Sequence, residues 1–333
     1  MQGIQDTRIG AGVTRASTSA GLVVAVIAAA SFGLSGAFIK PLLESGWSPA
    51  AAVTARSLIG GSVLVPVAIF VLRGRWSSLW RGRWRVLAVA LIGIAGTQLA
   101  YFAALQRIPV NTAILIEYTA PLLLVAFAWI TSRRAPGGLV LAGSAVALAG
   151  LVLVVSPGGD VDYDPLGIAF AGLAAVGCAV YYVVAARPSD GLPPVALAAS
   201  GLVLGGVALG LVGVAGLVPF TATFGTVEMF GGPTPWWAPL LVVGTVATAI
   251  AYATSITATE MLGARLASFV GLLEVVAAAL YAWLLLGENL SLPQLLGGGL
   301  VLVGIAFVRS ERIGSAQPGL PDPAELGELR VQQ

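Results

Sequence analysis

The chain has 333 residues, of which 58% are hydrophobic and only 10% are charged, and its mean hydropathy is +0.95. This composition excludes an ordinary soluble domain and indicates a membrane protein. With a net charge of +2, a single cysteine (Cys178) and no histidine, the chain has no means of forming internal disulfides, Cys/His metal clusters or imidazole-based catalysis, and we expect no cofactor, metal or nucleic-acid partner.

Ten segments are long and apolar enough to cross a hydrocarbon layer of about 30 Å, which takes about 20 helical residues. In chain order they are residues 21–39, 50–72, 86–106, 110–131, 137–156, 166–186, 194–217, 238–258, 263–286 and 292–308. We therefore expect an all-α polytopic membrane protein with ten transmembrane helices. The polar tails, 1–19 and 310–333, are expected to be disordered.

The distribution of basic residues predicts the orientation of the chain. If the N-terminus is cytoplasmic, all 17 Lys and Arg residues except Lys40, Arg56 and Arg107 lie on the cytoplasmic side or at its edge. Cytoplasmic loops are enriched in basic residues, so this pattern predicts cytoplasmic N- and C-termini and an even number of spans. The stretch "RGRWSSLWRGRWR" at 73–85, with its interleaved tryptophans, is interpreted as an interfacial anchor rather than a nucleic-acid site.

The sequence also contains an internal repeat, because adding 154 to a residue number aligns the helices at the ends of its two halves. The aligned pairs include Trp129 with Trp283, Gly143 with Gly297 and Gly150 with Gly304. The chain thus divides into two five-helix repeats, 20–157 and 166–309. Since five is odd, the halves have opposite orientations in the membrane. Inverted repeats are typical of transporters that hold their substrate between the halves near the midplane.

The segment "LEVVAAALYAWLLLGENLSLPQLLGGGLVLVGI" at 273–305, with Arg56 early in the second span, carries a family resemblance. Over roughly residues 20–310 the chain resembles EamA-type transporters of the drug/metabolite transporter (DMT) superfamily. The resemblance implies a bacterial inner-membrane exporter of amino acids, related metabolites or toxic compounds. In the first half the position matching Glu288 is Arg134, which argues against a shared mechanistic role for Glu288.

Three charged residues, Arg56, Glu117 and Glu274, lie well inside the expected spans. A charge at the bilayer centre costs about 3 kcal/mol on insertion scales, so it normally faces a cavity or a partner. Pro121 cannot donate a hydrogen bond to the carbonyl group of Glu117, which leaves a structural kink and a free backbone acceptor beside a carboxyl group. The alternative is a structural ion pair between Arg56 and either carboxylate.

Polar residues recur along two further spans. Thr245, Thr248, Tyr252 and Ser255 form a stripe on the eighth, and Thr97, Gln98 and Tyr101 lie on the third. They are expected to line a central cavity, the alternative being that their hydroxyl groups bond to their own helices. The complete set of candidate substrate-binding residues is Arg56, Gln98, Tyr101, Glu117, Tyr118, Thr248, Tyr252, Ser255 and Glu274.

The glycines of "GSAVALAG" and "GGGLVLVG" are interpreted as small residues that let helices approach closely, since lipid offers no hydrophobic drive for helix association. A phosphate-binding loop would need a preceding strand and a following Gly-Lys-Ser/Thr, and neither is present.

The sequence therefore predicts a secondary transporter that exports amino acids or related small metabolites by alternating access. Arg56 would bind a carboxylate, Glu117 or Glu274 an ammonium group, and Tyr101 and Tyr252 an apolar portion. A cationic drug exporter is the alternative within transport. A passive channel or a membrane-embedded enzyme is the alternative from another class, although no nucleophile with an activating base is evident. The partners expected are a small-molecule substrate and membrane lipids, and a monomer is compatible with the sequence.

Overall fold

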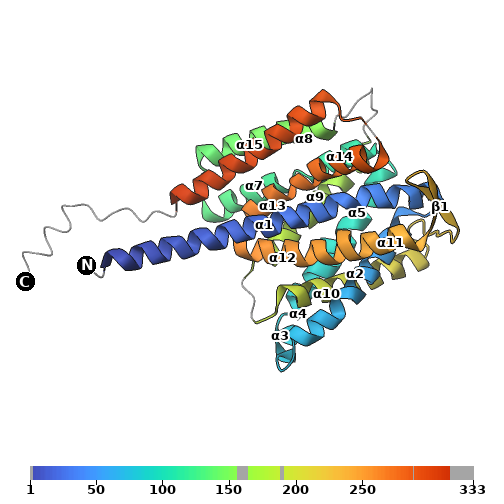
Figure 1. Ribbon diagram of the computed structural model, residues 1–333, viewed down its shortest axis with the longest axis horizontal. Coiled ribbons are helices and arrows are strands. Elements are labelled where there is room, and N and C mark those ends of the chain that lie inside the picture. The colour runs from blue at the N-terminus through green and yellow to red at the C-terminus, as the bar shows by residue number, and fades with distance from the viewer. Residues whose placement is uncertain (1–2, 156–163, 188–190, 288, 316–333) are drawn as a thin grey trace, which may run out of the picture.

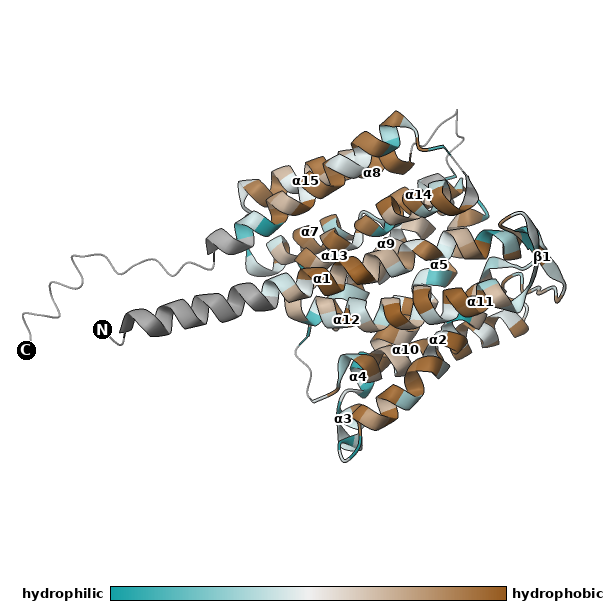
Figure 2. Ribbon diagram, in the orientation of Figure 1, coloured by the Kyte–Doolittle hydropathy of each residue, from teal (hydrophilic) through white to brown (hydrophobic). Residues whose placement is uncertain are grey.

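The computed structural model describes residues 3–155, 164–187, 191–287 and 289–315. Within these ranges ten helical segments have the length and hydropathy of membrane spans, which confirms the expected fold class. The spans are Thr18–Glu44, Pro49–Val71, Arg83–Leu105, Thr112–Ser132, Gly138–Val155, Pro165–Ala185, Pro194–Val214, Trp237–Leu262, Ala264–Leu285 and Leu292–Glu311. Apolar residues follow the helices along their length, as Figure 2 shows.

Several spans are assembled from shorter helices (Figure 1). The first half contains α1 (Gly3–Glu44), α2 (Pro49–Val71), α3 (Trp76–Arg81), α4 (Arg83–Leu87), the π-helix η1 (Ala88–Gly96), α5 (Thr97–Leu105), α6 (Val110–Glu117), α7 (Ala120–Ser132) and α8 (Gly138–Val155). The second half contains α9 (Pro165–Ala185), α10 (Pro194–Val214), the antiparallel strands β1 (Thr226–Met229) and β2 (Gly232–Pro235), α11 (Trp237–Gly244), the π-helix η2 (Thr245–Ile250), α12 (Ala251–Leu262), α13 (Ala264–Gly271), α14 (Leu273–Leu286) and α15 (Leu292–Ser315).

The N-terminal segment differs from the expectation of disorder, because α1 begins at Gly3 and projects from the bundle. Once the first span has formed, each further helical residue gains a backbone hydrogen bond, and the first proline is Pro41. At the other end α15 continues to Ser315. The remainder of the C-terminal tail, Glu288 and the acidic loop at 158–163 lie outside the described residues.

The repeat extends to the positions where helices break. Adding 154 to the bounds of α6, 110 and 117, gives 264 and 271, the bounds of α13. In the same way the end of η1 at 96 maps to 250, the end of η2. The two halves therefore share their irregular segments as well as their helices.

The last helices of the two halves, α8 and α15, pack against each other through glycines. A methyl group on Gly143 would lie 2.8 Å from the carbonyl oxygen of Gly304, and one on Gly150 would lie 2.6 Å from that of Gly297. Distances this short leave no room for a side chain, so the backbones touch as the small-residue spacing predicts. We call this contact the glycine seam.

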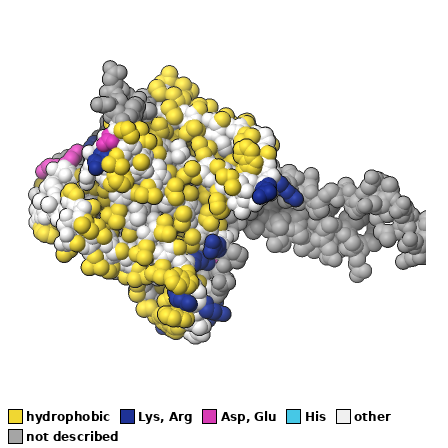
Figure 3. Space-filling view, turned by 180° about the vertical axis from the view of Figure 1, so that it is seen from behind, with side chains coloured by type: hydrophobic (Ala, Val, Ile, Leu, Met, Phe, Trp, Pro, Cys, Tyr) yellow, Lys and Arg dark blue, Asp and Glu magenta, His cyan; other side chains and the backbone are white. Residues whose placement is uncertain are grey.

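Loops with basic residues meet at the end of the bundle near α3 and α4. Arg85 donates hydrogen bonds to the carbonyl oxygens of Val184 and Ala185 at 3.0 and 2.9 Å. The backbone N–H of Val140 donates to the Glu311 carboxylate at 2.9 Å. Figure 3 shows that most of the visible Lys and Arg side chains gather around this end and that acidic ones lie toward the opposite end. Segments predicted to share the cytoplasmic side thus lie together.

The interfacial stretch at 73–85 forms two short helices with exposed tryptophans. Trp80 and Trp84 are 71% and 70% exposed, and the Arg83 guanidinium lies over both rings at 4.9 and 5.5 Å. Exposed tryptophan rings stacked with arginine suit the boundary between lipid and water. Its role as a membrane anchor stays a prediction.

The opposite end is closed by the segment between α10 and α11. The backbone N–H of Ser48 donates to Thr221 at 2.9 Å, and the Trp47 indole donates to the carbonyl oxygen of Thr223 at 2.7 Å. The β1–β2 hairpin, which sequence reasoning missed, turns through Phe230 and Gly231, whose φ angles are +54° and +80°. Two successive positive φ angles suit a two-residue hairpin turn.

Candidate functional site

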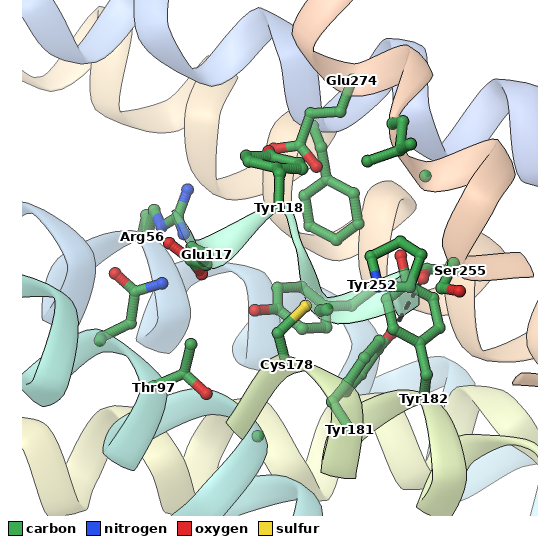
Figure 4. A pocket seen from close by; sticks show the side chains of 18 residues that line it. Arg56, Thr97, Glu117, Tyr118, Cys178, Tyr181, Tyr182, Tyr252, Ser255 and Glu274 are labelled. Carbon is green, nitrogen blue, oxygen red and sulfur yellow. Dashed lines mark hydrogen bonds between the residues drawn. The ribbon is translucent and has the colours of Figure 1, made fainter. Parts of the chain in front are cut away.

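A cavity of about 120 Å³ lies between the two halves. It brings together most of the predicted site residues, as Figure 4 shows. These are Arg56, Gln98, Glu117, Tyr118, Pro121, Tyr252, Ser255 and Glu274. Arg56 and Glu117 lie on one side of the cavity, and the tyrosines of α9 and α12 lie on the other.

Two predicted residues, Thr248 and Tyr101, do not line the cavity. Thr248 is fully buried and its methyl group packs against Gly60. The stripe on the eighth span assumed 3.6 residues per turn, but η2 is a π-helix, whose wider turns rotate Thr248 away from the face of Ser255. Thr245 instead bonds to the carbonyl oxygen of Leu241 at 2.7 Å.

Tyr101 packs into the apolar clusters at the end of the bundle, with its ring 6.3 Å from that of Phe102. It lies one turn beyond Gln98 along α5, so its ring reaches past the cavity. Thr97 does line the cavity, but its hydroxyl group donates to Ile92 at 2.9 Å. This bond is the backbone alternative that the sequence leaves open.

Glu117 stands at the break in the fourth span. It is the last residue of α6, and α7 starts three residues later at Ala120, with Pro121 in its first turn. Leu122 donates to the nearer carbonyl of Thr119 at 2.8 Å. Within the described chain no donor to the Glu117 carbonyl oxygen is found. Both the side chain and the backbone carbonyl of Glu117 therefore remain available as acceptors.

Glu274 stands at the matching break in the ninth span. The break falls at Leu272, which is the position 118 + 154, and Glu274 is the second residue of α14. No proline causes this break. The backbone N–H of Val275 donates a hydrogen bond to the carbonyl oxygen of Leu272 at 3.2 Å. The Glu274 carboxyl group lies beside Tyr118, with which it interacts.

Arg56 is not bound to either carboxylate. Its Nη1 donates to the hydroxyl group of Ser35 at 2.9 Å, while its Nε is buried and has no hydrogen-bond partner among the described residues. Within the described residues no ion pair joins Arg56 to Glu117 or Glu274. The structural ion pair considered from the sequence is therefore not formed here, and guanidinium donors remain open toward the cavity.

The far wall of the cavity is aromatic, and sequence reasoning missed most of it. The ring of Tyr252 lies edge-on to Phe32 at 5.0 Å and to Tyr181 at 5.9 Å, and Tyr181 lies edge-on to Tyr182 at 5.3 Å. The Tyr181 hydroxyl group donates to Ser255 at 2.9 Å. We call these four rings the aromatic wall.

One feature of the α9 sequence could have indicated that this helix lines the cavity. Cys178, Tyr181 and Tyr182 all line the cavity, and they interrupt a span whose other residues are mostly small or aliphatic. Across the described residues no group of three or more His, Cys, Asp or Glu side chains is placed to hold a metal ion. The site thus offers one guanidinium, two carboxyl groups, an amide, hydroxyl groups and aromatic rings.

Comparison with known proteins agrees with the fold. The chain is 26% identical over 303 residues to the uncharacterized inner membrane transporter YicL of Salmonella typhimurium, covering 88% of this chain and 96% of that one. It is 26% identical over 307 residues to the uncharacterized transporter YwfM of Bacillus subtilis, covering 91% and 96%. A crystal structure with 20% identity shares the fold, with a TM-score of 0.72 over 90% of this chain and 99% of that chain.

The family model of the EamA-like transporter family matches the chain twice, at residues 19–156 and 165–310. These matches cover both five-helix halves, including every element that lines the cavity. The chain belongs to the EamA-like transporter family and is a multi-pass transporter of the bacterial inner membrane.

Proposed function

We propose that the protein is a secondary transporter that exports an amino acid or a related small amine by alternating access through the central cavity. One observation carries this proposal. Arg56 with open donors and two carboxyl groups, one from each half, line a single cavity where the halves meet. Charged groups are costly inside a membrane and normally mark a substrate or ion pathway.

The chemistry of the cavity suits a molecule with separate charged and apolar parts. Arg56 would bind a carboxylate through the donors that Ser35 leaves open. Glu117 or Glu274 would bind an ammonium group, and the aromatic wall would contact the apolar portion. A cavity of about 120 Å³ has room for only a small molecule in this conformation.

A cationic compound is the second candidate substrate. The cavity is lined by two carboxyl groups but only one guanidinium, and the aromatic wall suits a cation because ring faces attract positive charge. Such a substrate would need no contact with Arg56.

Counterflow in proteoliposomes tests the transport mechanism and the substrate together. Radiolabelled phenylalanine and phenylethylamine differ by one carboxylate, so the pair separates the two candidates. We expect excess unlabelled substrate inside the vesicles to accelerate uptake of the label. Uptake without such trans-stimulation would indicate a channel, and chemical conversion of the label would indicate an enzyme. Glu228→Gln, on the exposed strand β1, is a control that should behave like the wild type.

We also propose that the end of the bundle carrying Arg85 and the two termini faces the cytoplasm. The support is the concentration of basic residues on loops that meet at this end. A reporter fused after Ser315 should read cytoplasmic, and one inserted at the hairpin turn by Gly231 should read periplasmic. Opposite readings would reverse the proposed orientation.

A further inference from the structure

We infer that Glu117 is an exchangeable proton site, which carries a proton when the cavity holds no cation and releases it, one for one, to a singly charged amine. The inference rests on the proposed role of the cavity as the substrate site. It assigns different roles to the two carboxyl groups and names the ion that is exchanged.

The charge of the cavity supplies the first step. Arg56, Glu117 and Glu274 are the charged side chains among its lining residues in the described chain. With both carboxyl groups ionised the cavity would hold one uncompensated negative charge inside the membrane, which is costly. A single bound proton removes that charge. A single bound monocation does the same.

The helix ends decide which carboxyl group takes the proton. Glu117 is the last residue of α6, where the partial negative charge of the helix dipole disfavours a carboxylate and favours a positive partner. Glu274 is in the first turn of the 14-residue α14, where the partial positive charge stabilises a carboxylate. Glu274 also interacts with Tyr118. Glu274 therefore stays ionised, and Glu117 alternates.

The charged and titratable groups around Glu117 come from several elements, while α8, which also packs against α6, contributes none. They are Arg56 of α2, Tyr101 of α5, Tyr118 at the break, Cys178 of α9, Tyr252 of α12 and Glu274 of α14. Only Arg56 favours an ionised Glu117, and its guanidinium is held by Ser35 without an ion pair to Glu117. An ionised Glu274 repels an ionised Glu117, because the two carboxylates in the cavity carry the same charge.

The exchange step conserves charge. The O–H bond of the Glu117 carboxyl group breaks, the proton passes to the solvent, and the carboxylate pairs with the ammonium group of the incoming amine. The cavity keeps the same total charge before and after. A zwitterionic amino acid brings no net charge, so the cavity stays neutral only if Glu117 keeps its proton. Amine and amino acid are thus expected to differ in proton release.

Infrared difference spectroscopy tests the protonation directly and needs no substrate. Purified protein at neutral pH should show the C=O absorption of a protonated carboxyl group. Removing either carboxyl group would leave the other one to balance Arg56, so the charge-conserving changes Glu117→Asp and Glu274→Asp are compared, with Glu228→Asp as the control at an exposed position. We expect the band to shift in frequency in Glu117→Asp and to stay unchanged in Glu274→Asp. A band that is absent from the wild type, or that shifts in Glu274→Asp rather than in Glu117→Asp, would overturn the inference.

Proton release on binding tests the exchange. In weakly buffered solution we expect one proton released per bound phenylethylamine and none per bound phenylalanine, with binding measured in parallel. Amine binding without proton release would overturn the inference and leave the transport proposal intact. If neither compound binds and counterflow fails, the proposed substrate class is wrong, and the infrared result still decides whether Glu117 holds the proton.

Discussion

The two halves of the protein meet at the glycine seam and at the central cavity. The seam follows the symmetry of the repeat, whereas the charged residues of the cavity do not. In the seam Gly143 faces Gly304 and Gly150 faces Gly297, and 143 + 154 and 150 + 154 give 297 and 304. Each contact is therefore the repeat-related copy of the other. A symmetric contact of small residues holds two inverted helices together without reference to any substrate.

The cavity is asymmetric where it carries charge. Adding 154 to 117 leads to Gly271, and subtracting 154 from 274 leads to Ala120, and both of these small residues also line the cavity. Each half thus supplies one carboxyl group at a position where the other half has only Gly or Ala. The comparison teaches that duplicated sequence is retained where the halves pack and has diverged where a ligand would be bound.

The largest expected effect is on the seam. Gly150→Leu would drive a side chain into the Gly297 carbonyl group and separate α8 from α15, at a cost of about 3 kcal/mol. We expect a sharp loss of folded yield in size-exclusion chromatography. Gly299→Leu, on the exposed side of α15 with no atom within 4 Å of an added methyl group, is the matched control. Equal yields from both variants would refute the seam.

Glu117→Gln tests the cavity without touching the seam. Loss of a charge-assisted hydrogen bond to a substrate costs about 1.5–3 kcal/mol, so amine flux should fall about 10- to 100-fold. Folding should survive because Arg56 is not paired with Glu117. Flux in proteoliposomes and thermal unfolding measure the two effects. A collapse of folding that Arg56→Gln restores together with flux would establish a structural ion pair instead.

Gly271→Ala probes the small residue that is the counterpart of Glu117. Its added methyl group would collide with the Tyr182 hydroxyl group and push that ring into the cavity. Because the end of a side chain can move, the cost should be about 1 kcal/mol, with a roughly fivefold loss of apparent substrate affinity. Gly172→Ala on α9, where an added methyl group has open space, should leave affinity unchanged. Similar affinities in both variants would show that the small size of Gly271 is not needed to leave room for the Tyr182 ring.

Pro121→Ala should have the smallest effect, because it makes the first-half break resemble the second. Position 121 + 154 is Val275, whose N–H is bonded. Alanine would restore a donor near the Glu117 carbonyl group and raise stability by up to about 1 kcal/mol. We expect a higher Tm and a flux reduced severalfold, because the kink shapes the cavity. Wild-type flux in this variant would make the proline a bystander.

The ten spans, the repeat and the three charged residues that share one cavity could all be predicted from residue types and their order. Hydropathy decides which segments enter lipid, since backbone groups there must bond within a helix. The cost of a charge in lipid forces Arg56, Glu117 and Glu274 inward, so their burial follows from residue type alone. The spacing of the glycines indicated the seam, because small residues on one helix face let two backbones approach closely in lipid.

The choice of neutral residues that face the cavity depends on how the helices pack and could not be predicted from the sequence. Regular helical spacing assigned Thr248 to the lining, but the π-helix η2 rotates it into the packed core. Tyr181 and Tyr182 reach the cavity because α9 packs beside the broken spans, which no periodicity in α9 reveals. The Arg56–Ser35 bond joins residues on different helices. The free energy of a neutral side chain differs little between lipid, protein and cavity surroundings. Packing between helices, rather than residue type, therefore determines which way such a side chain points.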